Sequence, residues 1–284
     1  MQSVSYTHLN AGIPVRIVHG HSASGEARNF LRKIDAALGR KTHMMWGTNF
    51  IACSKMAAIY SFGKKNLDKV KILNNGIHPE KFSFNLDFRN EVRDELGISN
   101  NFVLGAISRL SPQKNHLFMI DILEETLKIR PDAVLLIVGS FSTCNDGYLD
   151  SIKDYVDKKN LLQKVVFAGE RKDAYRVMNA IDAYLFPSLW EGLGIAAVEA
   201  QANGLNVFAS DCVPEEAHIT NNYHVISLRD NAKKWAETIC KAQYNIPRLD
   251  CSRKVSEAGY NIRLSAKQME EYYEKLHVEK SIQG

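Results

Sequence analysis

The sequence predicts an α/β protein whose main part is a doubly wound parallel sheet. Short apolar runs alternate with stretches of helical periodicity along almost the whole chain of 284 residues. Strands that alternate with helices run parallel and are covered on both faces, so they read as continuous apolar segments. A third observation is a strand–glycine turn–helix unit at residues 182–204. Such a turn brings backbone N–H groups to the carboxyl end of a strand.

Each strand is expected where an apolar run ends at a glycine or polar turn. The expected strands are 15–19, 49–52, 69–73, 102–108, 133–138, 165–168, 183–186, 207–209 and 224–227. Helical periodicity between them predicts helices at about 27–38, 55–62, 88–96, 116–129, 148–158, 173–180, 195–203 and 232–243.

A turn-rich interruption at residues 74–79 indicates a domain boundary between Gly63 and Asn85. The first part supplies only two or three strands, whereas the second has enough for one doubly wound domain. We therefore expect a partial N-terminal domain at 1–70, a Rossmann-like domain at 71–245 and a helical segment at 246–284. In the last segment, four apolar residues are spaced to lie along one helix face. They are Ile262, Met269, Tyr272 and Leu276.

Composition and charge narrow the class of protein. The chain is 45% hydrophobic and 24% charged, and its net charge of +4 is too small to indicate a nucleic-acid partner. No apolar run approaches the ~20 residues of a membrane helix, and Met1 to Ala11 does not resemble a secretory signal. The five scattered cysteines indicate neither a disulfide framework nor a zinc site, so we expect reduced thiols in a cytoplasmic protein.

The turn after the strand at 183–186 carries two glutamates. Glu191 lies in the turn, the helix begins near Gly194, and Glu199 follows one to two helical turns later. The start of that helix is an anion site. Because carboxylates would repel a phosphate, we expect both glutamates to bind hydroxyl groups. A ligand with phosphates flanked by two polyols, such as a nucleotide sugar, fits this arrangement.

The alternative for these glutamates is an ordinary surface position. Glu199, however, lies between Val198 and Ala200 in a helix that looks buried. A buried carboxylate without a partner is costly. The functional interpretation is therefore preferred.

Two cations follow another strand. Arg109 comes after the carboxyl end of the strand at 102–108, and Lys114 stands just before a helix. In open α/β sheets ligands bind at that edge, and these cations would neutralise a diphosphate. The alternative is two solvated surface cations, which is less favoured once the motif is paired with the glycine turn at residues 191–194.

Three further segments each allow two interpretations. His19 and His21 end the first strand and are suited to a substrate hydroxyl or phosphate, although at least one could be structural. The turn at Gly169 and Glu170 could hold a nucleobase, and Asp173 could cap the next helix. A basic helical stretch could rest on anionic lipid or be a solvated face; its cations are Arg28, Arg32, Lys33, Arg40 and Lys41.

Together these motifs resemble glycosyltransferase family 4, the retaining enzymes of the GT-B fold, over nearly the whole chain. The strongest pieces are Glu191-x7-Glu199 within Phe-Pro-Ser-Leu-Trp-Glu-Gly-Leu-Gly, and Arg109 with Lys114. Supporting pieces are Ala52-Cys53-Ser54, Asn75-Gly76-Ile77 and residues 169–173. The opening segment at 16–21 looks like a subgroup that builds capsular polysaccharides and exopolysaccharides.

The resemblance implies roles for these residues. Arg109 and Lys114 would hold the donor diphosphate and stabilise the leaving group, and Glu199 would bind the ribose. Glu191 would contact the donor sugar, with the amides of Gly192, Leu193, Gly194 and Ile195 near sugar and phosphate. Gly169 and Glu170 would face the base. One N-domain histidine of the family reaches the donor sugar, and we favour His21 over His19.

The family generally works without a metal ion or other cofactor, and the sequence contains no Asp-x-Asp motif. Retention is commonly attributed to same-face attack, in which the departing phosphate takes the acceptor's proton. The donor would be a nucleoside-diphosphate sugar, and the acceptor would be a glycan or lipid-linked acceptor. The basic stretch, if it rests on lipid, would bring a cytoplasmic protein into peripheral contact with the inner face of the membrane.

One departure from the family pattern concerns the front of the chain. Roughly the first hundred residues of the pattern, including a glycine-rich loop, have no counterpart here. Either the sequence is truncated or a second chain completes the N-terminal domain. We therefore expect a retaining glycosyltransferase or its donor-binding remainder. The alternatives are a non-catalytic nucleotide-sugar-binding module, and a GT-B epimerase or phosphorylase.

Overall fold

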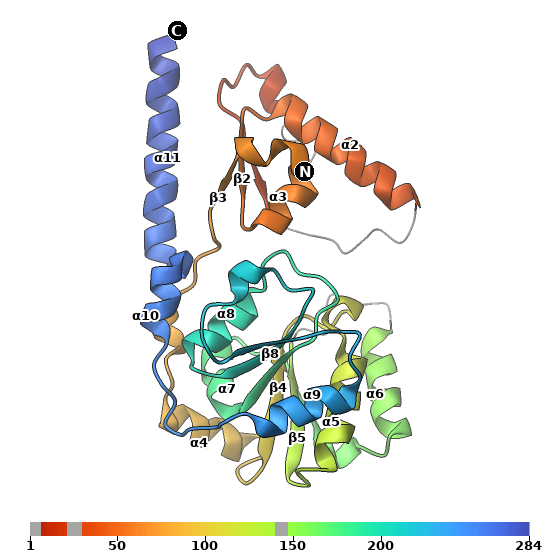
Figure 1. Ribbon diagram of the computed structural model, residues 1–284. Helices are drawn as coiled ribbons and strands as arrows, with labels where there is room; N and C mark the ends of the chain where they lie inside the picture. The colour runs from red at the N-terminus through yellow and green to blue at the C-terminus, as the bar shows by residue number, and fades with distance from the viewer. Residues whose placement is uncertain (1–6, 22–29, 140–146, 284) are drawn as a thin grey trace.

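The protein contains two parallel sheets, one of three strands and one of six. The computed structural model describes residues 7–21, 30–139 and 147–283 (Figure 1). The small sheet has the order β1-β2-β3 and the large sheet the order β6-β5-β4-β7-β8-β9. The small-sheet strands are β1 (Ile17–Gly20), β2 (Asn49–Ala52) and β3 (Val70–Ile72). The large-sheet strands are β4 (Phe102–Ile107), β5 (Ala133–Val138), β6 (Val165–Gly169), β7 (Ala183–Phe186), β8 (Asn206–Ser210) and β9 (Tyr223–Ile226).

Helices connect the strands in the expected alternation. They are α2 (Phe30–Trp46), α3 (Lys55–Phe62), α4 (Leu86–Glu95), α5 (His116–Leu127), α6 (Tyr148–Lys158), α7 (Ala174–Ala180), α8 (Ile195–Ala202), α9 (Ala232–Lys241), α10 (Ser252–Val255) and α11 (Ile262–Gln283). All nine expected strands are present, and β3 lies in the small sheet, so that sheet extends two residues past the boundary expected at residue 70.

The helix expected at 27–38 ends eight residues later, at Trp46. Gly39 and the β-branched Thr42 lower the helix propensity of this stretch. Met44 nevertheless packs against the core between the small sheet and α3. Tertiary packing therefore extends the helix beyond the point where its local sequence favours it.

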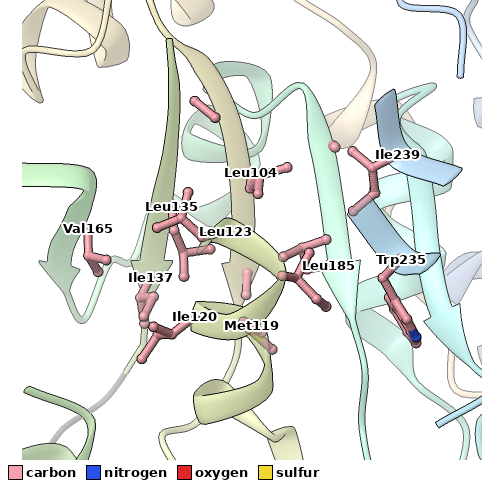
Figure 2. Packing of buried hydrophobic residues seen from close by; sticks show 14 of the residues in the cluster. Leu104, Met119, Ile120, Leu123, Leu135, Ile137, Val165, Leu185, Trp235 and Ile239 are labelled. Atoms are coloured by element: carbon pink, nitrogen blue, oxygen red, sulfur yellow. The ribbon is translucent and has the colours of Figure 1, made fainter. Parts of the chain in front are cut away.

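Apolar side chains of the large sheet alternate between two cores. Leu104, Leu135, Ile137 and Leu185 face the core under α5, α6 and α9, where Met119, Ile120, Leu123 and Trp235 meet them (Figure 2). Their neighbours along the strands face the second core, under α4, α7 and α8. Both faces of the sheet are thus buried, as parallel strands require.

The order of the large sheet reverses between β4 and β7. From β4 the chain moves outward through β5 to β6, and it then returns to the other side of β4 with β7. Ligands of open α/β sheets bind at the carboxyl ends of the strands at such a switch point. The loops that follow β4 and β7 are therefore where a site is expected.

A cluster of charged side chains lies at the amino ends of the strands, opposite the switch-point loops. Asp182 accepts hydrogen bonds from Arg89 and Arg93, each at 2.6 Å, and from the backbone N–H of Val103 at 2.8 Å. Arg248 donates to the carbonyl of Ile181 nearby. Burial, followed by the charge of Arg89, lowers the pKa of Arg248 to about 9. The carboxylate of Asp182 thus offsets the positive charge of three guanidinium groups.

The C-terminal segment joins the two sheets. Val255 and Tyr260 lie in a third core with residues of the small sheet and of α8, and Ile77 forms a parallel bridge with Asn261. The predicted apolar face of α11 is confirmed, since Leu276 is buried and Ile262, Met269 and Tyr272 are partly buried. Figure 1 shows α11 running beside β3, where Lys71 lies over the Tyr272 ring at 4.3 Å.

Cys53, Cys212, Cys240 and Cys251 are free thiols, and Cys144 lies outside the described residues. None of the helices in the described segments has both the length and the apolar character of a membrane span.

Candidate functional site

The loops after β4 and β7 are joined by hydrogen bonds. The backbone N–H of Leu189 donates to the carbonyl of Gln113 at 2.8 Å. The Gln113 side chain donates to the carbonyl of Trp190 at 2.7 Å, and the Asn115 side chain to that of Pro187 at 3.2 Å. Asn115 has a left-handed φ of 61°, a conformation that asparagine tolerates better than most residues. The two predicted motifs therefore lie in loops that contact each other.

Lys114 and Glu191 form an ion pair between these two loops. The Lys114 Nζ donates to the Glu191 Oε1 at 2.5 Å, and the two side chains are only 13% and 8% exposed. The ammonium group also lies 4.9 Å from the centroid of the Phe186 ring. The structure thus brings together two residues for which the sequence predicted separate roles.

Arg109 differs from Lys114. It is exposed, and it has no hydrogen-bond or ion-pair partner within the described residues. Lys114 ends the 3-10 turn Pro112–Lys114, which places it directly ahead of α5. Among the described residues, one cation of the predicted diphosphate site therefore has no partner, whereas the other is paired.

His116, the first residue of α5, is fully buried and was not predicted as a site residue. Its Nε2 lies 3.3 Å from the Ser108 Oγ. Burial, and then the charge of Lys114, lowers the pKa of His116 to about 4. A neutral imidazole beside Lys114 adds no further charge to the loop.

The glycine turn leads into α8 without a capping side chain. Gly194, the N-cap residue, has a φ of +95° that favours glycine. The backbone N–H groups of Gly192, Leu193 and Gly194 donate to no atom of the described chain. With the orphan amides of the first turn, which begins at Ile195, they can donate hydrogen bonds to an anion.

Glu199 lies on α8, whose Ala197, Val198, Ala200 and Ala202 are buried. Its carboxylate has no partner among the described residues. Burial raises the pKa of Glu199 to about 7. A partly protonated carboxyl group without a partner is suited to hydroxyl groups of a ligand.

The turn also contacts the small-sheet part of the chain. Ser54, the N-cap residue of α3, donates its hydroxyl to the carbonyl of Gly192, and the Lys55 N–H donates to Glu216 at 2.8 Å. The Leu193 side chain is buried in the third core. The carboxyl end of β2 therefore meets the loop after β7.

His21 is exposed and lies at the carboxyl end of β1. Its Nδ1 is 3.1 Å from the Asn75 Oδ1, and its ring centroid is 4.0 Å from that of His19. Burial, and then the proximity of His21, lowers the pKa of His19 to about 4. No contact joins His21 to Glu191 or Lys114, so its predicted role stays a prediction.

Gly169 is the last residue of β6, and Glu170, which follows it, is exposed. The carbonyl of Gly169 accepts from the N–H of Gly139 at 2.8 Å. A Cβ at Gly139 would lie 1.8 Å from the carbonyl oxygen of Ser108. The sequence interpretation missed Gly139, which lets the ends of β4, β5 and β6 approach closely.

Asp173 occupies the expected N-cap position of α7, but the expected capping hydrogen bond is not formed, because its side chain accepts from no N–H group of the helix. It accepts instead from Arg171 at 2.8 Å. The nearby guanidinium is a stronger partner for a carboxylate than a backbone amide is.

Of the basic stretch, Arg28 lies outside the described residues, as do the side chains of Arg32 and Lys33. Arg40 is partly buried and Lys41 is exposed. The predicted membrane contact therefore stays a prediction.

The fold and the switch-point site define an α/β protein with a cationic loop opposite a glycine turn. The family model described as glycosyl transferases group 1 matches residues 88–257. The chain therefore belongs to that family.

Relatives agree with this assignment. The chain is 30% identical over 237 residues to the putative glycosyltransferase EpsF of Bacillus subtilis, covering 82% of this chain and 60% of that protein. It is 28% identical over 221 residues to an Escherichia coli enzyme named UDP-Gal:alpha-D-GlcNAc-diphosphoundecaprenol alpha-1,3-galactosyltransferase, covering 75% and 56%. The chain thus spans less than two thirds of the length of these relatives.

Among solved structures, Anabaena HepE in complex with UDP and glucose superposes with a TM-score of 0.80 at 19% identity, covering 96% of this chain and 76% of that one. The fold is accordingly GT-B, as expected from the sequence.

Proposed function

We propose that this chain carries the donor site of a retaining glycosyltransferase. It would transfer a hexose or hexosamine from a nucleoside-diphosphate sugar to a glycan or lipid-linked acceptor in surface polysaccharide synthesis. The observation that carries the proposal is the joined pair of loops at the switch point. These loops place Arg109, Lys114, the amides of residues 192–195 and Glu191 at one edge of the sheet.

The proposed roles follow from the chemistry of each group. Arg109, Lys114 and the free amides bind the diphosphate and stabilise the charge that develops on it as the glycosidic bond breaks. Glu191 binds the donor sugar, and Glu199 binds the ribose. Gly169 and Glu170 lie near the base, and His21 reaches the sugar from the small-sheet side.

Retention and independence from metal ions are parts of the proposal. Two side-chain cations and a helix N-terminus can balance a diphosphate, which supports donor binding without a metal. Full activity in EDTA would agree with this, and activity that returns only with added Mg²⁺ would contradict it. The anomeric configuration of the product, read by NMR, tests retention.

The location of the protein is proposed from its charge distribution. Residues 1–72 contain eleven Lys and Arg but only three Asp and Glu. Lys41, Lys64, Lys65 and Lys69 in this part are exposed. Such a surface favours anionic lipid, and we propose a cytoplasmic protein in peripheral contact with the inner face of the membrane. Co-sedimentation with anionic and with neutral vesicles tests this.

Calorimetric titration with UDP and GDP, and then with their sugar conjugates, tests the donor site. Binding followed by slow donor hydrolysis supports an enzyme. Binding without turnover, even with acceptors, would favour a binding module. A folded sample that binds none of these ligands would contradict the proposed site.

Lys114→Ala is expected to weaken nucleoside diphosphate binding by about 1.5–3 kcal/mol, because a charge-assisted contact to phosphate is lost. Lys153→Ala removes an exposed lysine from α6 and is the matched control. Equal affinities of the Lys114→Ala variant and the wild type, measured by calorimetry, would remove Lys114 from the site.

A further inference from the structure

The two cations of the proposed diphosphate site are in different states. Arg109 is exposed and has no partner within the described residues, whereas Lys114 is nearly buried and paired with Glu191 at 2.5 Å. An incoming diphosphate can contact Arg109 at once. It can gain the full charge of Lys114 only if it competes with the carboxylate of Glu191.

Glu191 is constrained by the same contact. Lys114 is the partner of its carboxylate within the described chain, and the side chain is 8% exposed. A carboxylate has about four acceptor positions, so hydroxyl groups could still bind it. While Lys114 holds it, however, its negative charge and one oxygen are directed at the ammonium group.

We infer that the Lys114–Glu191 pair is a latch that the donor diphosphate opens. In the ligand-free protein the pair neutralises Lys114 and withholds Glu191. A bound diphosphate takes over the ammonium group, and the released Glu191 carboxylate then accepts hydrogen bonds from the donor sugar. This inference rests on the proposed donor site and adds an order of events to it.

The physical cost of opening explains why the order matters. Separating a nearly buried ion pair leaves a carboxylate without compensation, which is strongly unfavourable. A free sugar cannot replace the lost charge at Lys114, but a diphosphate can. Glu191 is therefore available to the sugar only when the diphosphate is in place, so a free sugar should bind poorly alone.

The test is a double-mutant cycle in nucleotide affinity, with UDP as the probe, or GDP if only GDP binds. Glu191→Gln keeps the shape of the side chain but removes its charge. It should tighten UDP binding about tenfold, in line with the coupling measured between close charge pairs. In a Lys114→Met background the same change should alter the affinity less than about twofold, because no ammonium group remains to be released.

An equal gain in both backgrounds would mean that Glu191 merely repels phosphate, and it would overturn the latch. Unchanged or weaker UDP binding by Glu191→Gln alone would also overturn it. A crystal structure of the wild-type chain with UDP gives a check that needs no variant: an intact Lys114–Glu191 pair would contradict the inference. If the folded wild type bound no nucleotide, the proposed function itself would fail, whereas nucleotide binding with additive variants refutes only the latch.

Discussion

Asp182→Ala is expected to destabilise the protein by about 3–5 kcal/mol, the largest stability loss that we expect from one side chain. Asp182 binds Arg89 and Arg93 at 2.6 Å each, and all three side chains are at most 11% exposed. Its removal also takes away the hydrogen-bond acceptor of the Val103 backbone N–H. Three buried or nearly buried guanidinium ions would then repel one another with no carboxylate among them.

Urea denaturation followed by circular dichroism measures this loss. Asp154→Ala, at an exposed aspartate of α6, is the matched control and should change stability little. Asp182→Asn keeps an acceptor but loses the charge, so it should lie between the wild type and the alanine variant. A loss below about 1 kcal/mol for Asp182→Ala would contradict a structural role for the cluster.

Glu199→Gln is expected to stabilise the protein at alkaline pH while weakening ligand binding. The folded state raises the pKa of Glu199 to about 7 from an ordinary value of 4.5. The proton is therefore held more tightly in the folded state, and stability falls as pH rises between these two values. Glutamine does not titrate, so its advantage over glutamate should grow by about 2–3 kcal/mol between pH 5 and pH 8.

The measurement is the free energy of unfolding of both proteins at several pH values, with Glu271→Gln on the exposed face of α11 as the control. If the difference in the free energy of unfolding between Glu199→Gln and the wild type did not change with pH, folding would not raise the pKa of Glu199. Glu199→Gln should also weaken nucleoside diphosphates but not inorganic diphosphate. Equal losses for both ligands would contradict the ribose role.

The alternation of strands and helices could be predicted from the sequence because buried parallel strands are short apolar runs with clear ends. β2, β5 and β7 were predicted to the residue for this reason. The end of α2 could not be predicted, since packing of Met44 and not local propensity extends the helix. Strand order is likewise a property of tertiary packing, so the switch point became visible only in the structure.

The positions of Arg109, Lys114, Glu191 and Glu199 on two loops and a helix could be anticipated from their places after strands. The contact between Lys114 and Glu191 could not, because 77 residues separate them and each has a plausible role alone. Gln113 and Asn115, which join the loops, were also missed. Both residues flank Lys114 in the sequence, which could have drawn attention to them, but amide side chains are common in turns.

The hydrogen bond from Ser54 to Gly192 connects the glycine turn, which belongs to the proposed donor site, to the small-sheet part of the chain. The amides of this turn are proposed to bind the donor, while the Gly192 carbonyl and the Leu193 side chain contact the small-sheet part of the chain. Thermodynamic linkage is reciprocal. If a shift of the small-sheet part relative to the turn changes donor affinity, donor binding changes the equilibrium of that shift by the same free energy. An acceptor that docks on the small-sheet side could therefore adjust donor affinity without touching the donor.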